Sequence, residues 1–235
     1  DYDRPVALAK GFKGNNLFGV DRNGDVVGAL RKRGVLVVDG ELMEVLNSWS
    51  GARPVGAVIA DLCCGLERPL VRRFYEVMWR PHMHDAVFAV NLLRGRDASS
   101  NAVRPKLAEL SWTLPGAKQV LVEKHRGLMM LTWLIGIVVA EMRIKCGWSE
   151  TQLGQLMEFC SRHANGRIFS YRSTAGQIFD SVVFRNPFGW VDVIDNDRRH
   201  LIERLPAPDR KVKAKIAAVL AHRTRRSMPC NQVVH

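Results

Sequence analysis

Residues 128–140, LMMLTWLIGIVVA, are the stretch around which the rest of the chain has to pack. Apart from Thr132 and Gly136 this stretch is apolar on every face of a helix, and such a helix must be covered by protein or by lipid. A bilayer span needs roughly 17–25 apolar residues, whereas this run ends at Glu141 after about 13. We therefore expect a buried central helix, inside a longer helical segment over about residues 117–145.

The composition favours a folded, strongly basic protein. Of its 235 residues 47% are hydrophobic, which is enough for a core, and the formal net charge is +12. Such a charge points to a polyanionic partner, with nucleic acid as the first candidate and an anionic membrane surface as the second. The alternative is that the positive charge only keeps the protein in solution. The five cysteines lack the spacing typical of a small disulfide-bonded domain, so we expect free thiols. Free thiols favour the cytoplasm or another reducing intracellular compartment. An organelle, reached with a targeting peptide that is then removed, is the alternative.

The N-terminal part predicts β structure. Residues 1–16 are polar and glycine-rich, so we expect a flexible arm. In residues 17–39, Asn23-Gly24 stands between apolar segments, which is a strong hairpin signal because both residues tolerate a positive φ. Arg31, Lys32 and Arg33 then form a basic turn before a second strand. This hairpin region would carry three cations at its tip.

Residues 41–165 predict a helical body. A short helix over residues 41–49 is followed by a mainly helical stretch from 55 to 95, interrupted at Pro69 and Pro81. Ser149 and Gln152 have the spacing of a capping box, which predicts a helix that ends near residue 165. Further helices are expected over residues 83–93 and 106–112.

The C-terminal part predicts a small sheet and a basic helix. Segments rich in β-branched and aromatic residues favour strands over residues 168–171, 177–184 and 190–194. Helices are expected over about residues 198–205 and 209–222, with a tail at 227–235. Together these patterns predict one α+β domain over residues 17–226, mostly helical around the buried central helix, with an N-terminal hairpin region and a small C-terminal sheet.

Residues 58–67, VIADLCCGLE, carry a possible cofactor motif. Asp61, Cys64 and Gly65 match D-L-x-C-G-x-G, so the stretch resembles the first motif of class I S-adenosylmethionine-dependent methyltransferases. The resemblance implies a strand, then a loop whose glycines let the backbone approach the cofactor. Glu67 stands at the place of the last glycine, and no second strand ends in an acid to hold the ribose. The residues favour the other interpretation, a buried helix with two small thiols, and hence no cofactor.

Other chemical signatures are weak. Cys160 and His163, and His82 with His84, lack the paired spacing of structural zinc sites, so we expect no metal. A divalent-metal nuclease site could in principle be formed by Asp180, Asp192, Asp195 and Asp197, but the spacing of Asp192 and Asp195 puts them on opposite faces of a regular strand. Nucleophile motifs are absent from the sequence, and we expect no catalytic residue.

Clusters of cations remain as the main functional signal. Arginine predominates, which favours forked phosphate recognition, and the spread suits a surface that follows a nucleic-acid backbone. We expect a non-catalytic, sequence-tolerant RNA-binding structural protein of nucleocapsid or ribonucleoprotein type, which self-associates or assembles with other proteins. The alternatives are the methyltransferase with a degenerate first motif and a peripheral membrane or matrix-type protein on anionic lipid. The expected nucleic-acid contacts are Arg31, Lys32, Arg33, Arg68, Arg72, Arg73, Arg94, Arg96, Arg167, Arg172, Arg198, Arg199, Arg210, Lys211, Lys213, Lys215, Arg223, Arg225 and Arg226.

Overall fold

The computed structural model shows a mixed α+β protein, which confirms the predicted fold class at this level. It describes residues 16–51, 53–62, 64–94, 125–163, 167–173, 175–186 and 205–227. Within these, only the backbone is described for residues 128, 145, 157, 159–163, 167–169 and 222–227. The expected arm, the helices at 106–112 and 198–205, the strand at 190–194 and the tail lie wholly or almost wholly outside the described residues.

The chain divides into two compact units. Unit 1 comprises Asp1–Ala52 together with Pro206–His235, and unit 2 comprises Arg53–Leu205. The C-terminal helix therefore belongs to the same unit as the N-terminal strands. The single domain expected over residues 17–226 stays a prediction.

Unit 1 begins with a strand–helix–strand element rather than the predicted hairpin. Strand β1 (Phe18–Asp21) pairs in parallel with β2 (Leu36–Asp39), and helix α2 (Gly24–Lys32) connects them. The hairpin prediction is wrong because Asn23 caps α2: its side chain accepts hydrogen bonds from the backbone N–H groups of Asp25 and Val26. The side-chain oxygen of an asparagine can accept backbone hydrogen bonds either in a turn or at the N-terminus of a helix. The Asn-Gly pair therefore does not distinguish the two structures.

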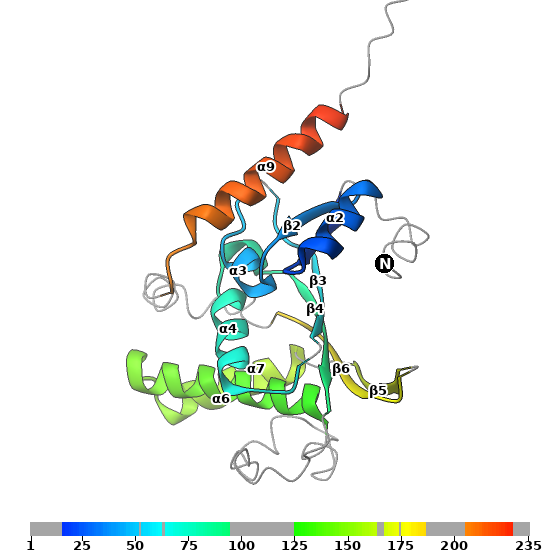
Figure 1. Ribbon diagram of the computed structural model, residues 1–235. Coiled ribbons are helices and arrows are strands. Elements are labelled where there is room, and N and C mark those ends of the chain that lie inside the picture. Colours follow the sequence, from blue (N-terminus) through cyan, green and yellow to red (C-terminus); the bar gives the residue numbers. More distant parts are fainter. Residues whose placement is uncertain are drawn as a thin grey trace, which may run out of the picture. The chain divides into compact units, whose positions relative to one another are not determined.

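The C-terminal helix closes the core of unit 1. Helix α9 (Arg210–Ser227) packs beside β2 and α3 (Leu42–Asn47) (Figure 1). Asp209 accepts hydrogen bonds from two backbone N–H groups in the first turn of α9. The helix expected over about residues 209–222 is therefore confirmed. The core of this unit includes a cluster of the buried side chains of Val38, Val45, Val212 and Ile216.

Unit 2 is built on a four-stranded sheet with the order β3-β4-β6-β5. Strands β3 (Ala57–Leu62) and β4 (Val87–Leu93) are parallel, whereas β6 (Ile178–Arg185) runs antiparallel to β4 and to β5 (Arg167–Arg172). The predicted strands at 168–171 and 177–184 are therefore confirmed. They extend a larger sheet instead of forming a separate one.

The predicted helices at both ends of residues 55–95 are wrong. Two strands, β3 and β4, occupy these places, and among the described residues of this stretch only α4 (Arg68–Met78) and the 3₁₀-helix η2 (Pro81–Met83) are helical. Burial alternates along β4 with a period of two, so that Phe88, Val90 and Leu92 are buried. Short apolar runs have no periodicity that separates a buried strand from a helix, which explains the error.

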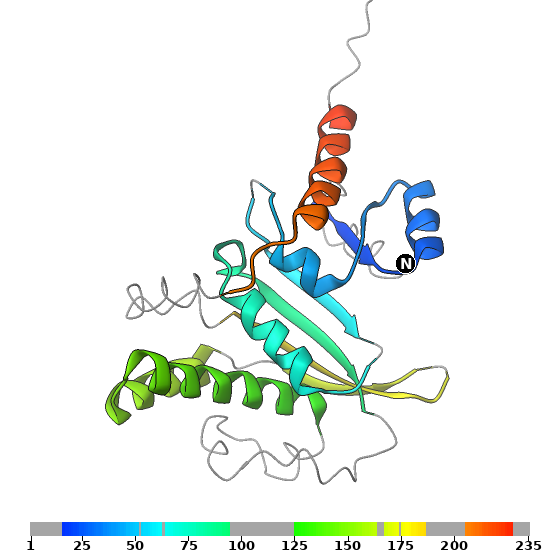
Figure 2. The ribbon, with the colours of Figure 1, turned by 60° about the vertical axis from the view of Figure 1, so that its left-hand side comes forward.

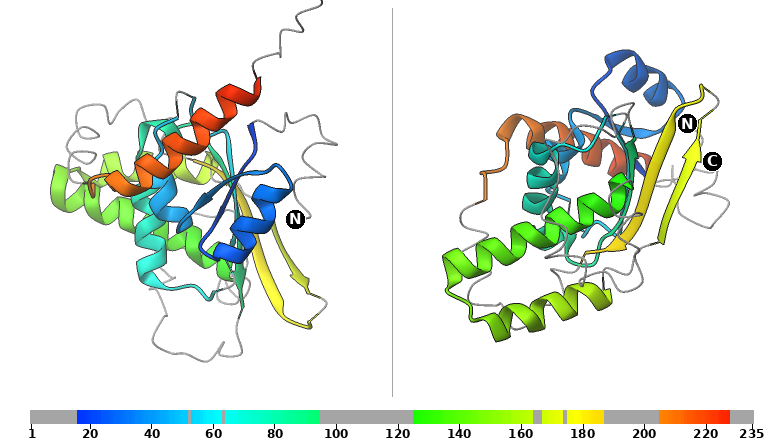
Figure 3. Two further views of the ribbon diagram at one scale, coloured as in Figure 1. Left: turned by 45° about the horizontal axis from the view of Figure 1, so that its top comes forward. Right: turned by 90° about the horizontal axis from the view of Figure 1, so that it is seen from below.

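Helices α4 and α6 lie on one face of this sheet (Figures 2 and 3). The rings of Phe74 on α4 and Phe88 on β4 meet at 6.2 Å between centroids, and Gly127 of α6 lies against Val182 of β6. We call this the covered face. The opposite face is open at β3, where Ile59 is 59% exposed, whereas Ser181 of β6 on that face is 1% exposed; we call it the open face.

The stretch at residues 128–140 lies within α6 (Arg126–Cys146), which α7 (Glu150–His163) accompanies side by side (Figure 1). One side of α6 buries apolar side chains, whereas Ala140 and Ile144 are exposed. The predicted capping box is confirmed: Ser149 N donates to Gln152 Oε1 at 2.9 Å, and Gln152 N donates to Ser149 Oγ at 3.4 Å.

Candidate functional site

The connection between β3 and α4 lies at the carboxyl end of the parallel strands. Cys64, Gly65 and Glu67 are exposed there, and a Cβ atom added to Gly65 would meet no atom within 4 Å. The Cys64 carbonyl accepts a hydrogen bond of 3.0 Å from Leu93 N, which holds the start of the loop against the end of β4. The strand–loop–helix context that the methyltransferase motif requires is present, so the interpretation of this stretch as a buried helix is wrong.

The loop fits a bound nucleotide-type cofactor only in part. Gly65 leaves room for close approach of a ligand to the backbone, as the motif needs. Glu67, which stands at the place of the last glycine of the motif, is the N-cap of α4, but its side chain makes no capping hydrogen bond. It therefore places a carboxylate at a position where the motif has no side chain. The methyltransferase type needs an acid at the end of the neighbouring strand to hold the ribose hydroxyls. Here Arg94 directly follows that strand, β4. The motif is therefore degenerate at two positions.

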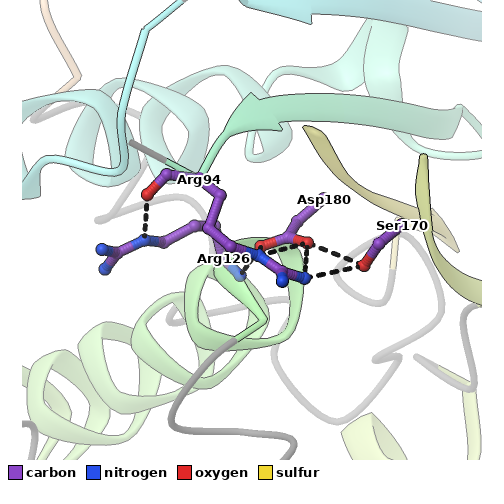
Figure 4. A network of polar contacts seen from close by, with 4 residues as sticks. All are labelled: Arg94, Arg126, Ser170 and Asp180. Carbon is purple, nitrogen blue, oxygen red and sulfur yellow. Dashed lines mark hydrogen bonds and ion pairs between the residues drawn. The ribbon is translucent and has the colours of Figure 1, made fainter. Parts of the chain in front are cut away.

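A buried ion-pair network lies beside this edge (Figure 4). Asp180 of β6 is 0% exposed and accepts from Arg94 Nε at 3.0 Å and from Ser170 Oγ at 2.8 Å. Its Oδ2 also accepts from the backbone N–H of Arg126, the first residue of α6, at 3.0 Å. Arg126 Nε in turn donates to the Arg94 carbonyl at 3.3 Å. The network thus joins the end of β4, the start of α6 and the β5–β6 pair.

The charge of Asp180 is held by these donors. Burial alone raises the pKa of a carboxyl group, but the hydrogen bonds from Arg94, the Arg126 backbone and Ser170 outweigh burial, so that the pKa of Asp180 lies below its usual range. The hydrogen bond to Asp180 correspondingly raises the pKa of Arg94. Asp180 is ionised at neutral pH and also supplies a negative charge at the positive end of the α6 dipole.

This network is occupied by its own partners. Both carboxylate oxygens of Asp180 accept hydrogen bonds, so Asp180 offers no carboxylate oxygen free of hydrogen bonds to a metal ion. The other aspartates of the nuclease hypothesis lie outside the described residues. In the part of the chain that is described, His, Cys, Asp and Glu side chains form no group of three that could hold a metal.

Two of the predicted phosphate contacts in unit 2 are engaged by carboxylates. Arg72 donates to Glu76 at 3.3 Å and to Glu141 at 2.9 Å, and its guanidinium lies 4.9 Å from the centroid of the Tyr75 ring. It joins α4 to α6. Arg94 binds Asp180, as described above. Both arginines serve to hold elements of unit 2 together.

The remaining predicted contacts of unit 2 lie on separate elements. Arg68 and Arg73 are exposed on α4. Arg172 lies on β5, where its Nη1 donates to the Gly176 carbonyl at 3.1 Å. Arg167 begins β5, and its side chain is not described. Arg96, Arg198 and Arg199 lie outside the described residues.

Unit 1 carries predicted cations on two helices. Arg31 and Lys32 form the last turn of α2, followed by Arg33 at its C-cap. All three are exposed. On α9, Lys215 donates to the Asp39 carbonyl at 2.9 Å and lies 3.6 Å from its carboxylate. Three further cations of α9 have described side chains, and all three are exposed: Arg210, Lys211 and Lys213. Arg223, Arg225 and Arg226 continue α9, with only their backbone described.

Sequence reasoning missed the polar residues of the sheet. Asn91 and Ser181 face each other across β4 and β6, and the hydroxyl of Ser181 donates to Asn91 Oδ1 at 2.6 Å. Asp180 was considered only as part of a metal site. One available signal was a polar residue inside an otherwise apolar run, Asn91 in VFAVNLL, which requires a partner when it lies in a sheet.

No protein-family model, curated protein or solved structure matches this chain at the significance required. None of the helices among the described residues has the length and apolar character needed to cross a bilayer.

Proposed function

We propose that unit 2 is a cofactor-binding unit of the class I S-adenosylmethionine-dependent methyltransferase type, with a degenerate first motif. One observation carries the proposal: residues 58–67 occupy a strand end and an exposed loop that leads into a helix, next to a parallel strand. Open α/β sheets bind ligands at the carboxyl ends of their strands.

The residues of the loop have distinct roles in this proposal. Gly65 lets the backbone approach the ligand, and the hydrogen bond from Leu93 to Cys64 keeps the loop in place. S-adenosylmethionine, when bound, would supply an activated methyl group. The carboxylate of Glu67 would repel the carboxylate of the ligand and weaken its binding, since like charges nearby disfavour each other.

Calorimetry of the full chain with S-adenosylmethionine tests this proposal. We expect saturable heat that Gly65→Val abolishes, because the added side chain fills the space that the ligand needs. Gly56→Val is a matched control, since a Cβ at Gly56 also meets no atom within 4 Å. Glu67→Gly should tighten binding. Absence of heat with the wild-type chain at millimolar ligand would reject the proposal.

A second candidate is RNA binding by unit 1, favoured by the exposed cations Arg210, Lys211 and Lys213 on α9. In this case the protein is a sequence-tolerant, structural RNA-binding protein that self-associates or assembles with other proteins. Phosphate contacts supply most of such affinity and make it depend on salt. The two candidates are compatible, because a methyltransferase that acts on RNA needs both a cofactor site and phosphate contacts.

Salt titrations of single-stranded RNA binding test the second candidate. The slope of log affinity against log salt should become shallower by about 0.7 for each phosphate contact that is lost. We expect this for Lys211→Gln/Lys213→Gln but not for Arg143→Gln/Arg185→Gln, a control in unit 2 with the same loss of charge. An unchanged slope in the first variant would count against α9. Binding to vesicles of acidic lipid that RNA does not displace would favour the peripheral membrane alternative.

A further inference from the structure

Three polar side chains from neighbouring strands form a row on the open face of the unit 2 sheet. Asp61 of β3 pairs in register with Asn91 of β4, and Asn91 pairs with Ser181 of β6. The row lies toward the carboxyl ends of β3 and β4. This is the edge at which open α/β sheets bind ligands.

The hydrogen bond within the row fixes the orientation of Asn91. Ser181 is 1% exposed, and its hydroxyl donates to Asn91 Oδ1 at 2.6 Å. Because a buried hydroxyl holds the carbonyl oxygen, the NH₂ group of Asn91 points away from Ser181, and no acceptor for it is found among the residues that the structure describes. Asp61 is exposed and makes no side-chain hydrogen bond to other residues in the described part of the chain. A fixed donor and a carboxylate acceptor thus stand side by side.

An apolar surface adjoins this polar row. The next residues toward the amino ends of β3 and β4 on the same face are Ile59 and Ala89, which are paired in register. Ile59 is 59% exposed, and Val87 beyond it is 37% exposed. Parallel strands are usually covered on both faces, so an isoleucine this open is unusual. Apolar surface with a few oriented polar groups is the composition of a ligand site.

We infer that the open face at Asp61 and Asn91 binds a nucleoside. Its planar base lies on Ile59 and Ala89, with its hydrogen-bonding edge toward the Asn91 NH₂ donors and the Asp61 carboxylate acceptor. Base edges present donors and acceptors side by side, which matches this pair. The same chemistry is offered by the adenosine part of a cofactor and by a nucleotide of a nucleic acid. The inference does not require S-adenosylmethionine to be the cofactor.

Titration of adenosine, guanosine, cytidine and uridine into the full ¹⁵N-labelled chain tests this inference. We expect at least one nucleoside to shift the side-chain NH₂ resonances of Asn91 in a saturable manner. Asp61→Asn and Asn91→Ala should each weaken binding by about tenfold or more, since each leaves one polar group of the base unpaired. Asp85→Asn, an exposed aspartate at the opposite end of β4, is the matched control and should bind as the wild type does.

Near-ultraviolet circular dichroism shows whether each variant is folded. Ile59→Ser is a further variant at an exposed position, and we expect it to bind the nucleoside more weakly because it removes apolar surface under the base. No saturable shift with any nucleoside, or wild-type affinity in the folded Asp61→Asn variant, would overturn the inference. Repeating the titration with saturating S-adenosylmethionine separates the sources: competition assigns the site to the cofactor, and unchanged binding assigns it to a nucleic acid. Nucleoside binding without S-adenosylmethionine binding would reject the proposed function alone.

Discussion

Asp180 and Arg94 form a forked ion pair across 86 residues of sequence, in which Arg94 Nε and Nη2 both donate to the carboxylate. Asp180 also accepts the first N–H group of α6 through Arg126. One buried carboxylate therefore satisfies the end of β4 and the start of α6 together. Removal of Asp180 would leave a guanidinium and a helix N-terminus without their anion.

We predict that Asp180→Ala lowers the free energy of unfolding by about 1.5–3 kcal/mol, because it removes charge-assisted hydrogen bonds from the partly exposed Arg94 guanidinium and from the Arg126 backbone. Urea unfolding followed by circular dichroism measures this loss. Asp85→Asn removes an exposed pair with Arg185 and should cost at most about 1 kcal/mol. Equal losses in the two variants would contradict the structural role of Asp180.

The contribution of Asp180 should also depend on pH. Its pKa is lowered in the folded protein, so the unfolded chain binds its proton first as pH falls. The stabilisation is fully present above the unfolded value of about 4 and is lost as pH falls through the folded pKa. The difference in unfolding free energy between wild type and Asp180→Asn should therefore shrink below about pH 4. A difference that grows in acid would contradict the assigned direction of the shift.

The start of α7 offers a test of local capping. Ser149→Ala removes the side-chain acceptor for Gln152 N, and loss of such a cap costs about 0.5–2 kcal/mol. Thr151→Ala, in the first turn and exposed, should change stability by less than about 0.5 kcal/mol. Thermal unfolding of both variants provides the comparison. A Thr151 variant as unstable as the Ser149 variant would argue against the cap.

Unit 1 should depend on α9 for its core. Ile216 is 0% exposed among Val38, Val45 and Val212, so Ile216→Ala should cost about 2–5 kcal/mol. Ala217→Ser on the exposed side of the same helix is the control. Limited proteolysis followed by mass spectrometry should show faster cleavage within unit 1 of the Ile216 variant. Cleavage confined to unit 2 would mean that α9 does not complete this core.

Local signals in the sequence were reliable where neighbouring residues decide the structure. Ser149 with Gln152 and the position of Asp209 before α9 each marked a helix start that the structure contains. Pro69 marked an interruption of a longer helical stretch, and the structure has the first turn of α4 there. The hairpin predicted at Asn23 was wrong, because an asparagine side chain can cap a helix as well as form a turn. Only the pairing of β1 with β2 distinguishes the two.

The sequence by itself determined the mixed fold class, the helix at residues 128–140 and the starts of α7 and α9. An apolar run of this length is typical of a buried helix, and caps act over three or four residues. Tertiary structure decided that residues 87–93 are a strand, and it decided for residues 57–62 between the strand that the motif resemblance implied and the expected helix. A short apolar run becomes a strand only when partners supply its hydrogen bonds. It also decided that Arg94 meets Asp180 and that Asn91 meets Ser181, because residues about 90 positions apart become neighbours only through strand pairing.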